Sequence, residues 1–236
     1  KNLIRIFFLR ERLKSIGKVK KDSHDNKLKH VHVIGAGTMG ADIAIWCAIN
    51  NFHVTLQDTS ESQMGKAVLN ANKSIKRKIK DKSLAQKTVD RLIPDVSGHG
   101  IKYADVIIEA IIENLEAKQN LFKKIESLAK PTAILATNTS SIRIEEIASQ
   151  LSSPDRLIGI HFFNPVRQMP LVEVIKTEIV DITTENATYD FVNKIGKLPL
   201  PVKSSPGFLV NAVLVPYLQN SMRSIDGGYK PEQIDQ

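Results

Sequence analysis

A short β-branched run that ends in a glycine-rich turn constrains this chain more than any other feature. Residues 30–37 read HVHVIGAG, and the turn continues as Gly35-Ala36-Gly37-Thr38-Met39-Gly40 into a helical pattern. In this GxGxxG spacing the first glycine permits a tight turn, the second lets the backbone approach a pyrophosphate, and the third allows close packing of helix on strand. The N-terminus of the helix offers unpaired N–H groups to phosphate oxygens. The segment therefore predicts a dinucleotide-binding unit.

An acidic residue follows the next predicted strand. Residues 53–58 read HVTLQD, so Asp58 lies about twenty residues past the glycines, where an acid accepts hydrogen bonds from ribose hydroxyls. A carboxylate there also repels a 2′-phosphate, which favours NAD over NADP as the cofactor. The alternative is that Asp58 only caps a loop or helix.

Strand and helix patterns alternate along most of the chain. Buried-strand patterns cover about 30–37, 53–58, 105–111, 133–140, 156–163, 170–176 and 198–203, and helical patterns cover 1–17, 39–50, 60–92 (one long helix or two shorter ones), the segment from 114 and 207–228. This alternation predicts an α/β fold, a Rossmann-type, mostly parallel sheet with helices on both faces. The last helix is too apolar to be stable alone, so we expect it to begin an all-α domain. The predicted divisions are a linker helix and polar linker (1–29), the NAD-binding domain (30–205) and the start of a helical domain (206–236).

Charge and composition exclude several classes of protein. The formal net charge is +8, but the excess lies in residues 1–30 and 66–91, which suggests local anion sites or solvated helix faces. We find no nucleic-acid-binding motif and predict no nucleic-acid partner. No apolar run approaches the roughly 18 residues of a membrane span. Cys47 is the one cysteine, which fits a reducing compartment. The basic opening segment lacks serine enrichment and carries Glu11, so we favour the cytoplasm, with the mitochondrial matrix or peroxisome as alternatives.

Three polar clusters follow or interrupt predicted strands, at the edge where open parallel sheets bind ligands. The first begins at Asn138 and includes Ser140 and Ser141, the second pairs His161 with Asn164, and the third is Glu173. We find no metal-ligating pattern and predict no metal.

The second and third clusters together suggest proton transfer. A lone histidine in IGIHFF would ordinarily be a core residue, but Glu173 stands in the apolar run PLVEVIK, where an unpaired acid is costly. If the two strands are neighbours, Glu173 can fix the tautomer of His161 and stabilise its imidazolium, which makes His161 a general base for alcohol oxidation. Ser140 is the best hydroxyl to hold a substrate oxygen. Ser140 or Ser141 could instead cap the helix that follows.

Several motifs occur in one order over residues 30–226: GAGTMGADIA, EAIIENLEAKQNLFKKIE, TNTSSIRI, GIHFFNPV with MPLVEVI, and PGFLVN. Together they resemble the L-3-hydroxyacyl-CoA dehydrogenases. The resemblance implies NAD-dependent oxidation of L-3-hydroxyacyl-CoA to 3-oxoacyl-CoA in fatty-acid β-oxidation, with acyl-CoA as the substrate. Two alternatives stay open: a short-chain 3-hydroxybutyryl-CoA dehydrogenase and a non-catalytic NAD-binding protein.

The resemblance also implies roles for individual residues. It makes His161 the base, Glu173 its partner, and Ser140 and Asn211 ligands of the substrate's 3-oxygen region. The implied NAD-binding residues are Gly35, Gly37, Thr38, Met39, Gly40, Asp58, Ala110, Glu113, Lys118, Asn138, Ser140 and Asn164. Ser74 and Lys80 fall more loosely where the family contacts coenzyme A.

The opening IRIFFLRERLK resembles the helix that joins the hydratase and dehydrogenase parts of bacterial multifunctional fatty-acid oxidation proteins, alpha-subunit type. We therefore expect a piece of such a protein, with most of its helical domain missing, and a homodimer or multienzyme complex formed mainly through that domain. Ala212 departs from the family, which usually has arginine there. We expect this piece to bind NAD and to turn over weakly or not at all.

Overall fold

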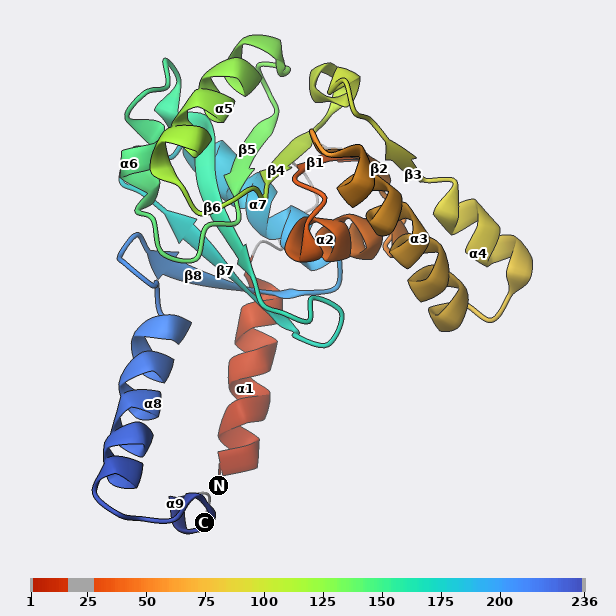
Figure 1. Ribbon diagram of the computed structural model, residues 1–236. Helices are drawn as coiled ribbons and strands as arrows, with labels where there is room; N and C mark the ends of the chain where they lie inside the picture. The colour runs from red at the N-terminus through yellow and green to blue at the C-terminus, as the bar shows by residue number, and fades with distance from the viewer. Residues whose placement is uncertain (1, 17–27, 235–236) are drawn as a thin grey trace.

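The computed structural model describes residues 2–16 and 28–234 (Figure 1). The strands are β1 (His30–Ile34), β2 (His53–Gln57), β3 (Leu92–Pro94), β4 (Val106–Glu109), β5 (Ile134–Thr137), β6 (Leu157–Phe162), β7 (Leu171–Lys176) and β8 (Leu198–Lys203). The helices are α1 (Asn2–Ser15), α2 (Thr38–Ile49), α3 (Glu61–Lys78), α4 (Lys82–Val89), α5 (Leu115–Leu128), α6 (Ile144–Ala148), α7 (Ile182–Lys194), α8 (Val210–Asp226) and α9 (Pro231–Ile234), with 3-10 turns η1 (His99–Tyr103) and η2 (Pro154–Arg156).

The strands form one sheet in the order β3-β2-β1-β4-β5-β6-β7-β8. Every neighbouring pair is parallel except β6 and β7, which run antiparallel. The strand order reverses between β1 and β4, and the carboxyl ends of strands at such a reversal are the usual ligand position of open parallel sheets. The predicted Rossmann-type fold is confirmed.

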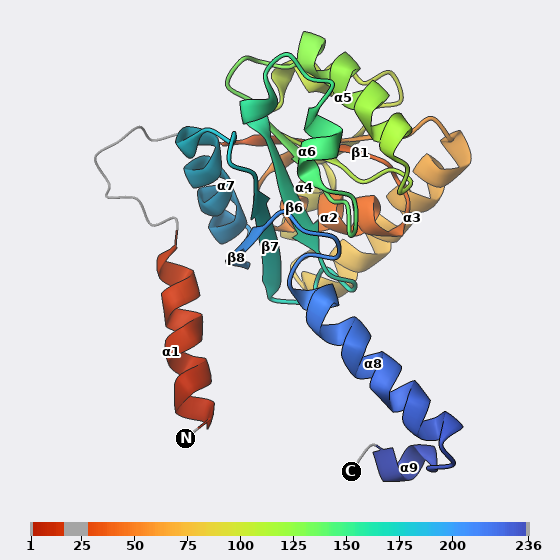
Figure 2. The ribbon, with the colours of Figure 1, turned by 90° about the vertical axis from the view of Figure 1, so that its left-hand side faces the viewer.

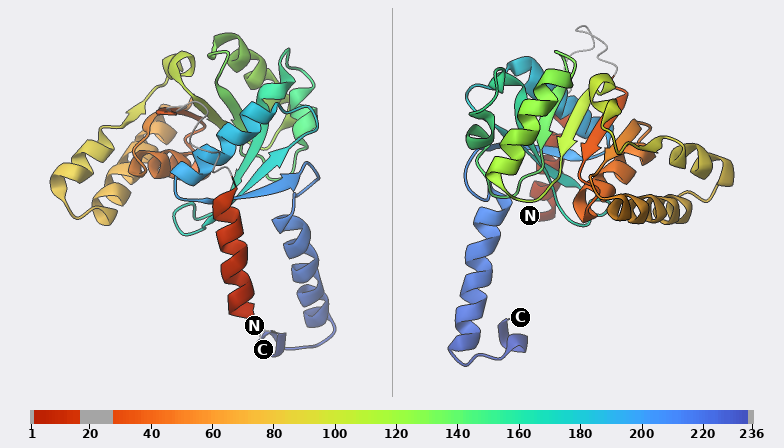
Figure 3. Two further views of the ribbon diagram at one scale, coloured as in Figure 1. Left: turned by 180° about the vertical axis from the view of Figure 1, so that it is seen from behind. Right: turned by 45° about the horizontal axis from the view of Figure 1, so that its top comes forward.

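Two apolar clusters cover the two faces of the sheet. One combines the strands with α2, α3 and α7, and the other combines them with η1, α5, α6 and Phe208. Figures 2 and 3 show these helices on opposite sides of the sheet. Because both faces are covered, β4, β5 and β6 are buried at every position, which explains why their sequences read as continuous apolar runs.

The segment 60–92 contains two helices, which was one of the two predicted alternatives, and it differs from the prediction at its end. The helix caps are Ser60 and Asp81, whose side chains accept hydrogen bonds from the first turns of α3 and α4. The edge strand β3 then begins at Leu92, inside the range predicted as helix. Three residues are too few to show a strand period, and Pro94 hides the pattern further because proline suits only a sheet edge.

Two helices extend from the sheet domain. α8 projects away from the sheet in Figure 1, and none of its side chains is buried. In α1 the apolar side chains of Ile6 and Phe7 are 52% and 59% exposed. The linker predicted over 18–29 lies mostly outside the described residues. The domain boundaries at 29 and 205 stay predictions.

Candidate functional site

The glycine turn has the shape that a dinucleotide requires. Gly35 has φ +104°, and a Cβ there would lie 2.4 Å from the carbonyl oxygen of Ala110. A Cβ on Gly40 would lie 1.8 Å from the carbonyl oxygen of Gly35, so that position admits only glycine. A Cβ on Gly37 would have no neighbour within 4 Å among the described residues. Gly37 is also the N-cap of α2 and supplies no capping side chain, which leaves first-turn N–H groups available to an anion.

Asp58 lies beside this turn. One carboxylate oxygen accepts a hydrogen bond from the backbone N–H of Ala36 at 2.6 Å, and the other accepts one from the N–H of Ser60 at 2.8 Å. A carboxylate can accept about four hydrogen bonds, so Asp58 retains capacity for ribose hydroxyls while it fixes the turn. The residues around the turn therefore fit NAD.

A buried carboxylate that the sequence analysis missed organises the next part of the edge. Glu109 ends β4 with no exposed surface, and one oxygen accepts hydrogen bonds from Lys118 Nζ at 2.6 Å and from the N–H of Ile111 at 2.8 Å. Its other oxygen accepts the hydroxyl of Thr137 at 2.6 Å. The available signal was the same as for Glu173, an acid within an apolar run. The predicted NAD contact Lys118 is thus a buried cation held by an acid.

Glu113 links Lys118 to the turn after β5. Its Oε2 lies 3.3 Å from Lys118 Nζ, and its Oε1 accepts the Thr139 hydroxyl at 2.6 Å and the N–H groups of Ser140 and Ser141 at 2.9 and 3.0 Å. Burial alone would raise the pKa of Glu113, but the Thr139 hydrogen bond and the charge of Lys118 lower it to about 2. The acid is therefore ionised at neutral pH and holds this turn in one shape.

The alternative role for the two serines, a cap for the following helix, is wrong. α6 begins at Ile144, its N-cap is Arg143, and no side chain of the N-cap residue bonds to the helix. The serines lie two and three residues too early, since their turn is folded around Glu113. Both serines are exposed, but the hydroxyl of Ser141 donates to Glu113 Oε1 at 2.9 Å, whereas that of Ser140 makes only a longer hydrogen bond to the same oxygen at 3.4 Å. Ser140 is therefore the serine with a hydroxyl more available to a ligand.

His161 and Glu173 meet as the sequence analysis predicted. They are directly opposed residues of the antiparallel β6–β7 pair, and His161 Nδ1 lies 2.8 Å from Glu173 Oε2. Both are buried, with 6% and 0% of their surfaces exposed. Phe163 and Phe208 pack on the imidazole with ring centroids 4.7 and 5.7 Å away. Because the carboxylate accepts the Nδ1 proton, the neutral imidazole presents Nε2 as a base.

Glu173 also touches the beginning of α8. Its second oxygen, Oε1, accepts hydrogen bonds from the N–H groups of Leu209 and Val210 at 3.0 and 2.8 Å. The carboxylate is thus held between an imidazole and the positive end of a helix, both of which stabilise its charge. The same contact fixes the start of α8, which carries Asn211.

The remaining predicted site residues lie on other elements of the fold. Asn138 follows β5, and its side-chain oxygen accepts the N–H of Phe162, which joins the ends of β5 and β6. Asn164 is exposed in the loop after β6, and Asn211 lies in the first turn of α8. Ser74 lies on α3 and Lys80 just after it, in an arm that Figure 1 shows on the far side of α2 from β6 and β7.

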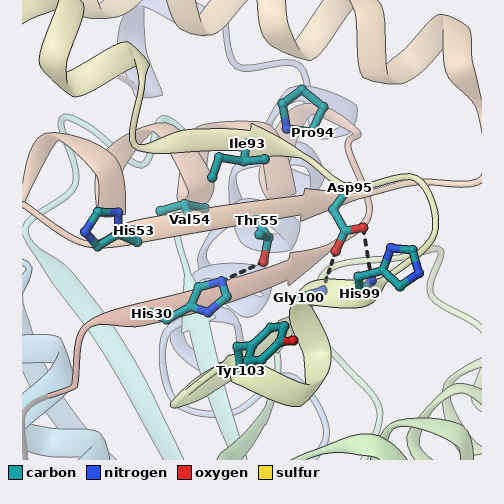
Figure 4. A pocket seen from close by; sticks show the side chains of 10 residues that line it. All are labelled: His30, His53, Val54, Thr55, Ile93, Pro94, Asp95, His99, Gly100 and Tyr103. Atoms are coloured by element: carbon teal, nitrogen blue, oxygen red, sulfur yellow. Dashed lines mark hydrogen bonds between the residues drawn. The ribbon is translucent and has the colours of Figure 1, made fainter.

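A separate pocket lies over β1, β2 and β3 and was not predicted. Figure 4 shows its histidines with Asp95, which accepts the N–H groups of His99 and Gly100 at 3.0 and 2.6 Å. Thr55 bonds to both His30 and the buried His32. Burial lowers the pKa of both histidines, which favours their neutral forms. The sequence pattern of these histidines gave no indication of this pocket.

Within residues 2–16 and 28–234, no group of three or more His, Cys, Asp or Glu side chains is arranged to hold a metal ion. No helix in that part of the chain combines the length and apolar character needed to cross a membrane.

The fold, the glycine turn and Asp58 define a dinucleotide-binding protein of the Rossmann class, and comparison with known proteins identifies the family. Residues 30–205 match the family model described as the NAD binding domain of 3-hydroxyacyl-CoA dehydrogenase. The chain therefore belongs to the 3-hydroxyacyl-CoA dehydrogenase family of NAD-dependent enzymes, as the motifs predicted.

Individual relatives agree with this assignment. The chain is 39% identical over 219 residues to mitochondrial hydroxyacyl-coenzyme A dehydrogenase of Rattus norvegicus, a match that covers 88% of this chain and 70% of the rat protein. It is 34% identical over 235 residues to the fatty acid oxidation complex subunit alpha of Idiomarina loihiensis, covering 98% of this chain and 33% of that protein. A solved (S)-3-hydroxybutyryl-CoA dehydrogenase from Ralstonia eutropha superposes with a TM-score of 0.83 at 36% identity, covering 87% of this chain and 75% of that one.

Proposed function

We propose that this chain is the NAD-binding part of an enzyme that oxidises L-3-hydroxyacyl-CoA to 3-oxoacyl-CoA in fatty-acid β-oxidation. The observation that carries the proposal is the buried His161–Glu173 pair, whose 2.8 Å contact leaves imidazole Nε2 for a substrate. The pair lies at the carboxyl edge of the sheet that carries the nucleotide-binding turn. The family supports this reaction class, and the site residues have the chemistry that it needs.

Alcohol oxidation requires that a proton and a hydride leave the substrate together. NAD, when bound, supplies the hydride acceptor. His161 Nε2 is proposed to take the hydroxyl proton, so that the alcohol carbon becomes a carbonyl. Glu173 holds the imidazole in the required tautomer and stabilises the imidazolium. The N–H groups of Leu209 and Val210 donate hydrogen bonds to the carboxylate and so stabilise its negative charge.

Further residues are assigned by the resemblance. Ser140 and Asn211 are proposed to bind the substrate's 3-oxygen region, and Asn138, Asn164, Ala110, Glu113 and Lys118 the nicotinamide side of the cofactor site. Ser74 and Lys80 are proposed to contact coenzyme A. Because these two residues lie on the arm formed by α3, the ligand must be extended and pass from the His161–Glu173 pair to that arm.

Replacing His161 by Gln in the full-length protein tests the proposal and separates it from a non-catalytic NAD-binding role. Loss of a general base lowers the rate by about 10²–10⁴-fold, while the NAD dissociation constant should stay within about twofold. Measurement of NADH formation from 3-hydroxybutyryl-CoA and from a longer acyl chain also distinguishes the short-chain alternative. Unchanged turnover in the Gln variant would contradict the assigned base.

Assembly and location are proposed from the relatives. The bacterial alpha subunit is part of a complex by its name, and its alignment reaches into the opening segment of this chain. We propose that the protein acts as a homodimer or within a multienzyme complex. We also propose a cytoplasmic location. Because some relatives are mitochondrial, the mitochondrial matrix is the alternative.

A further inference from the structure

Lys197 is a buried cation that the proposed chemistry does not use. It follows α7 directly before β8, and 4% of its surface is exposed. Its ammonium donates hydrogen bonds to the carbonyl oxygens of Val166 and Met169, the second at 2.7 Å. Nζ also lies 4.1 Å from the centroid of the Trp46 ring. Two carbonyls and one ring face therefore receive the three N–H bonds that an ammonium can direct.

These contacts join two parts of the molecule that the reaction needs in register. Val166 and Met169 belong to the loop between β6 and β7, which begins beside His161 and returns to Glu173. Trp46 belongs to α2, the helix that starts at the nucleotide-binding turn, and its indole N–H donates to the carbonyl of Ile195 at 2.8 Å. Lys197 is thus the point where the β6–β7 loop, α2 and the end of α7 meet.

From this geometry we infer that Lys197 is a positioning residue, which fastens the loop that joins the strands of His161 and Glu173 to the helix that begins at the nucleotide-binding turn. The inference rests on the proposed function. A loose loop would let Phe163 and the Asn164 backbone shift, and Phe163 packs on the imidazole. A misplacement of about 1 Å in such a site can cost about 10²-fold in rate.

A second lysine shares the surroundings of Lys197. Burial, followed by the repulsion of Lys78, lowers the pKa of Lys197 to about 8. Lys78 is the second cation on the same indole, with its Nζ 4.0 Å from the ring centroid, and it has no hydrogen bond to the loop among the contacts found in the described residues. Lys78 therefore offers a matched control, because its removal changes the ring's environment and leaves the loop carbonyls with their donor.

The test compares Lys197→Met with Lys78→Met in the full-length protein. For Lys197→Met we expect kcat to fall about 10- to 100-fold at saturating substrate, while NAD affinity measured by calorimetry changes less than about threefold. Lys78→Met should keep kcat within about twofold. Lys197→Arg, which restores donors to the loop, should recover part of the lost rate. Trp46 is the one tryptophan, so both Met variants should shift its fluorescence.

A readout without catalysis separates this inference from the proposed function. Amide hydrogen exchange over residues 163–170 should accelerate in Lys197→Met and stay unchanged in Lys78→Met, with or without measurable turnover. If Lys197→Met is too unstable to purify, Lys197→Gln, which keeps a shorter donor, takes its place in both measurements. Wild-type kcat per folded molecule together with unchanged exchange in the loop would overturn the inference. Failure of the His161→Gln test alone would overturn only the assigned base.

Discussion

Replacement of Lys118 by Met isolates the energetic role of the buried acid at the end of β4. Lys118 and Glu109 are 1% and 0% exposed and meet at 2.6 Å, so the substitution leaves a carboxylate in the interior without its cation. Removal of one partner of a buried pair typically costs about 3–5 kcal/mol. Since each kcal/mol lowers Tm by about 2–4 °C for a domain of roughly this size, we expect a fall of about 6–20 °C. Urea titrations of the wild type and of Lys118→Met at neutral pH would measure the difference in unfolding free energy.

A second substitution checks the origin of the loss. In the double variant Glu109→Leu with Lys118→Met no carboxylate stays fully buried without its cation. Glu113 loses its contact with Lys118 in both the single and the double variant, so that loss cancels in the comparison. The Thr137 hydroxyl and the Ile111 N–H each lose an acceptor, at about 1 kcal/mol apiece. The double variant should therefore be more stable than Lys118→Met alone. A cost below about 1 kcal/mol for the single variant, or a double variant that is less stable than the single one, would refute this reasoning.

Two further predictions concern the same edge of the sheet. Gly40→Ala should prevent folding or NAD binding, because its Cβ would lie 1.8 Å from a backbone oxygen. Gly37→Ala should fold with normal Tm and bind NAD at least about tenfold more weakly. Thermal melts and calorimetry would measure these two effects. The pKa of Glu113 is lowered to about 2, so its contribution to the free energy of unfolding is present above pH 4–5 and is lost as pH falls toward 2. The stability of Glu113→Gln should therefore fall less steeply with decreasing pH than that of the wild type. Equal slopes in an acid titration of the two proteins would contradict the assignment of Glu113.

Much of the fold could be predicted because parallel sheets covered on both faces leave a strong record in sequence. Buried strands such as β4 and β6 read as unbroken apolar runs, and the glycine turn fixes the position of the first crossover. β3 could not be predicted in this way, since a three-residue edge strand that contains Pro94 has neither a period nor an apolar run. Its pairing with β2 decides its conformation.

The His161–Glu173 pair was predictable for an energetic reason, whereas the partners of Glu109 and Lys197 were not. An acid in an apolar strand needs a partner, so Glu173 could be matched to His161 from the sequence pattern. The same signal at Glu109 pointed to a buried partner, but its identity as Lys118 depends on how α5 crosses the sheet. Lys197 gave no signal, because its acceptors are backbone carbonyls whose positions follow from the folded loop.

The two buried carboxylates of the sheet follow one design. Glu109 and Glu173 each point one oxygen at a nitrogen side chain of the proposed site and the other at a donor from a different segment, the hydroxyl of Thr137 for Glu109 and the start of α8 for Glu173. An apolar residue at either position would avoid the cost of burying a charge. The carboxylates are therefore explained by what they orient. Because both stand on strands, the groups they hold inherit the rigidity of the sheet, which is how a hydride site and a proton site can be kept in register.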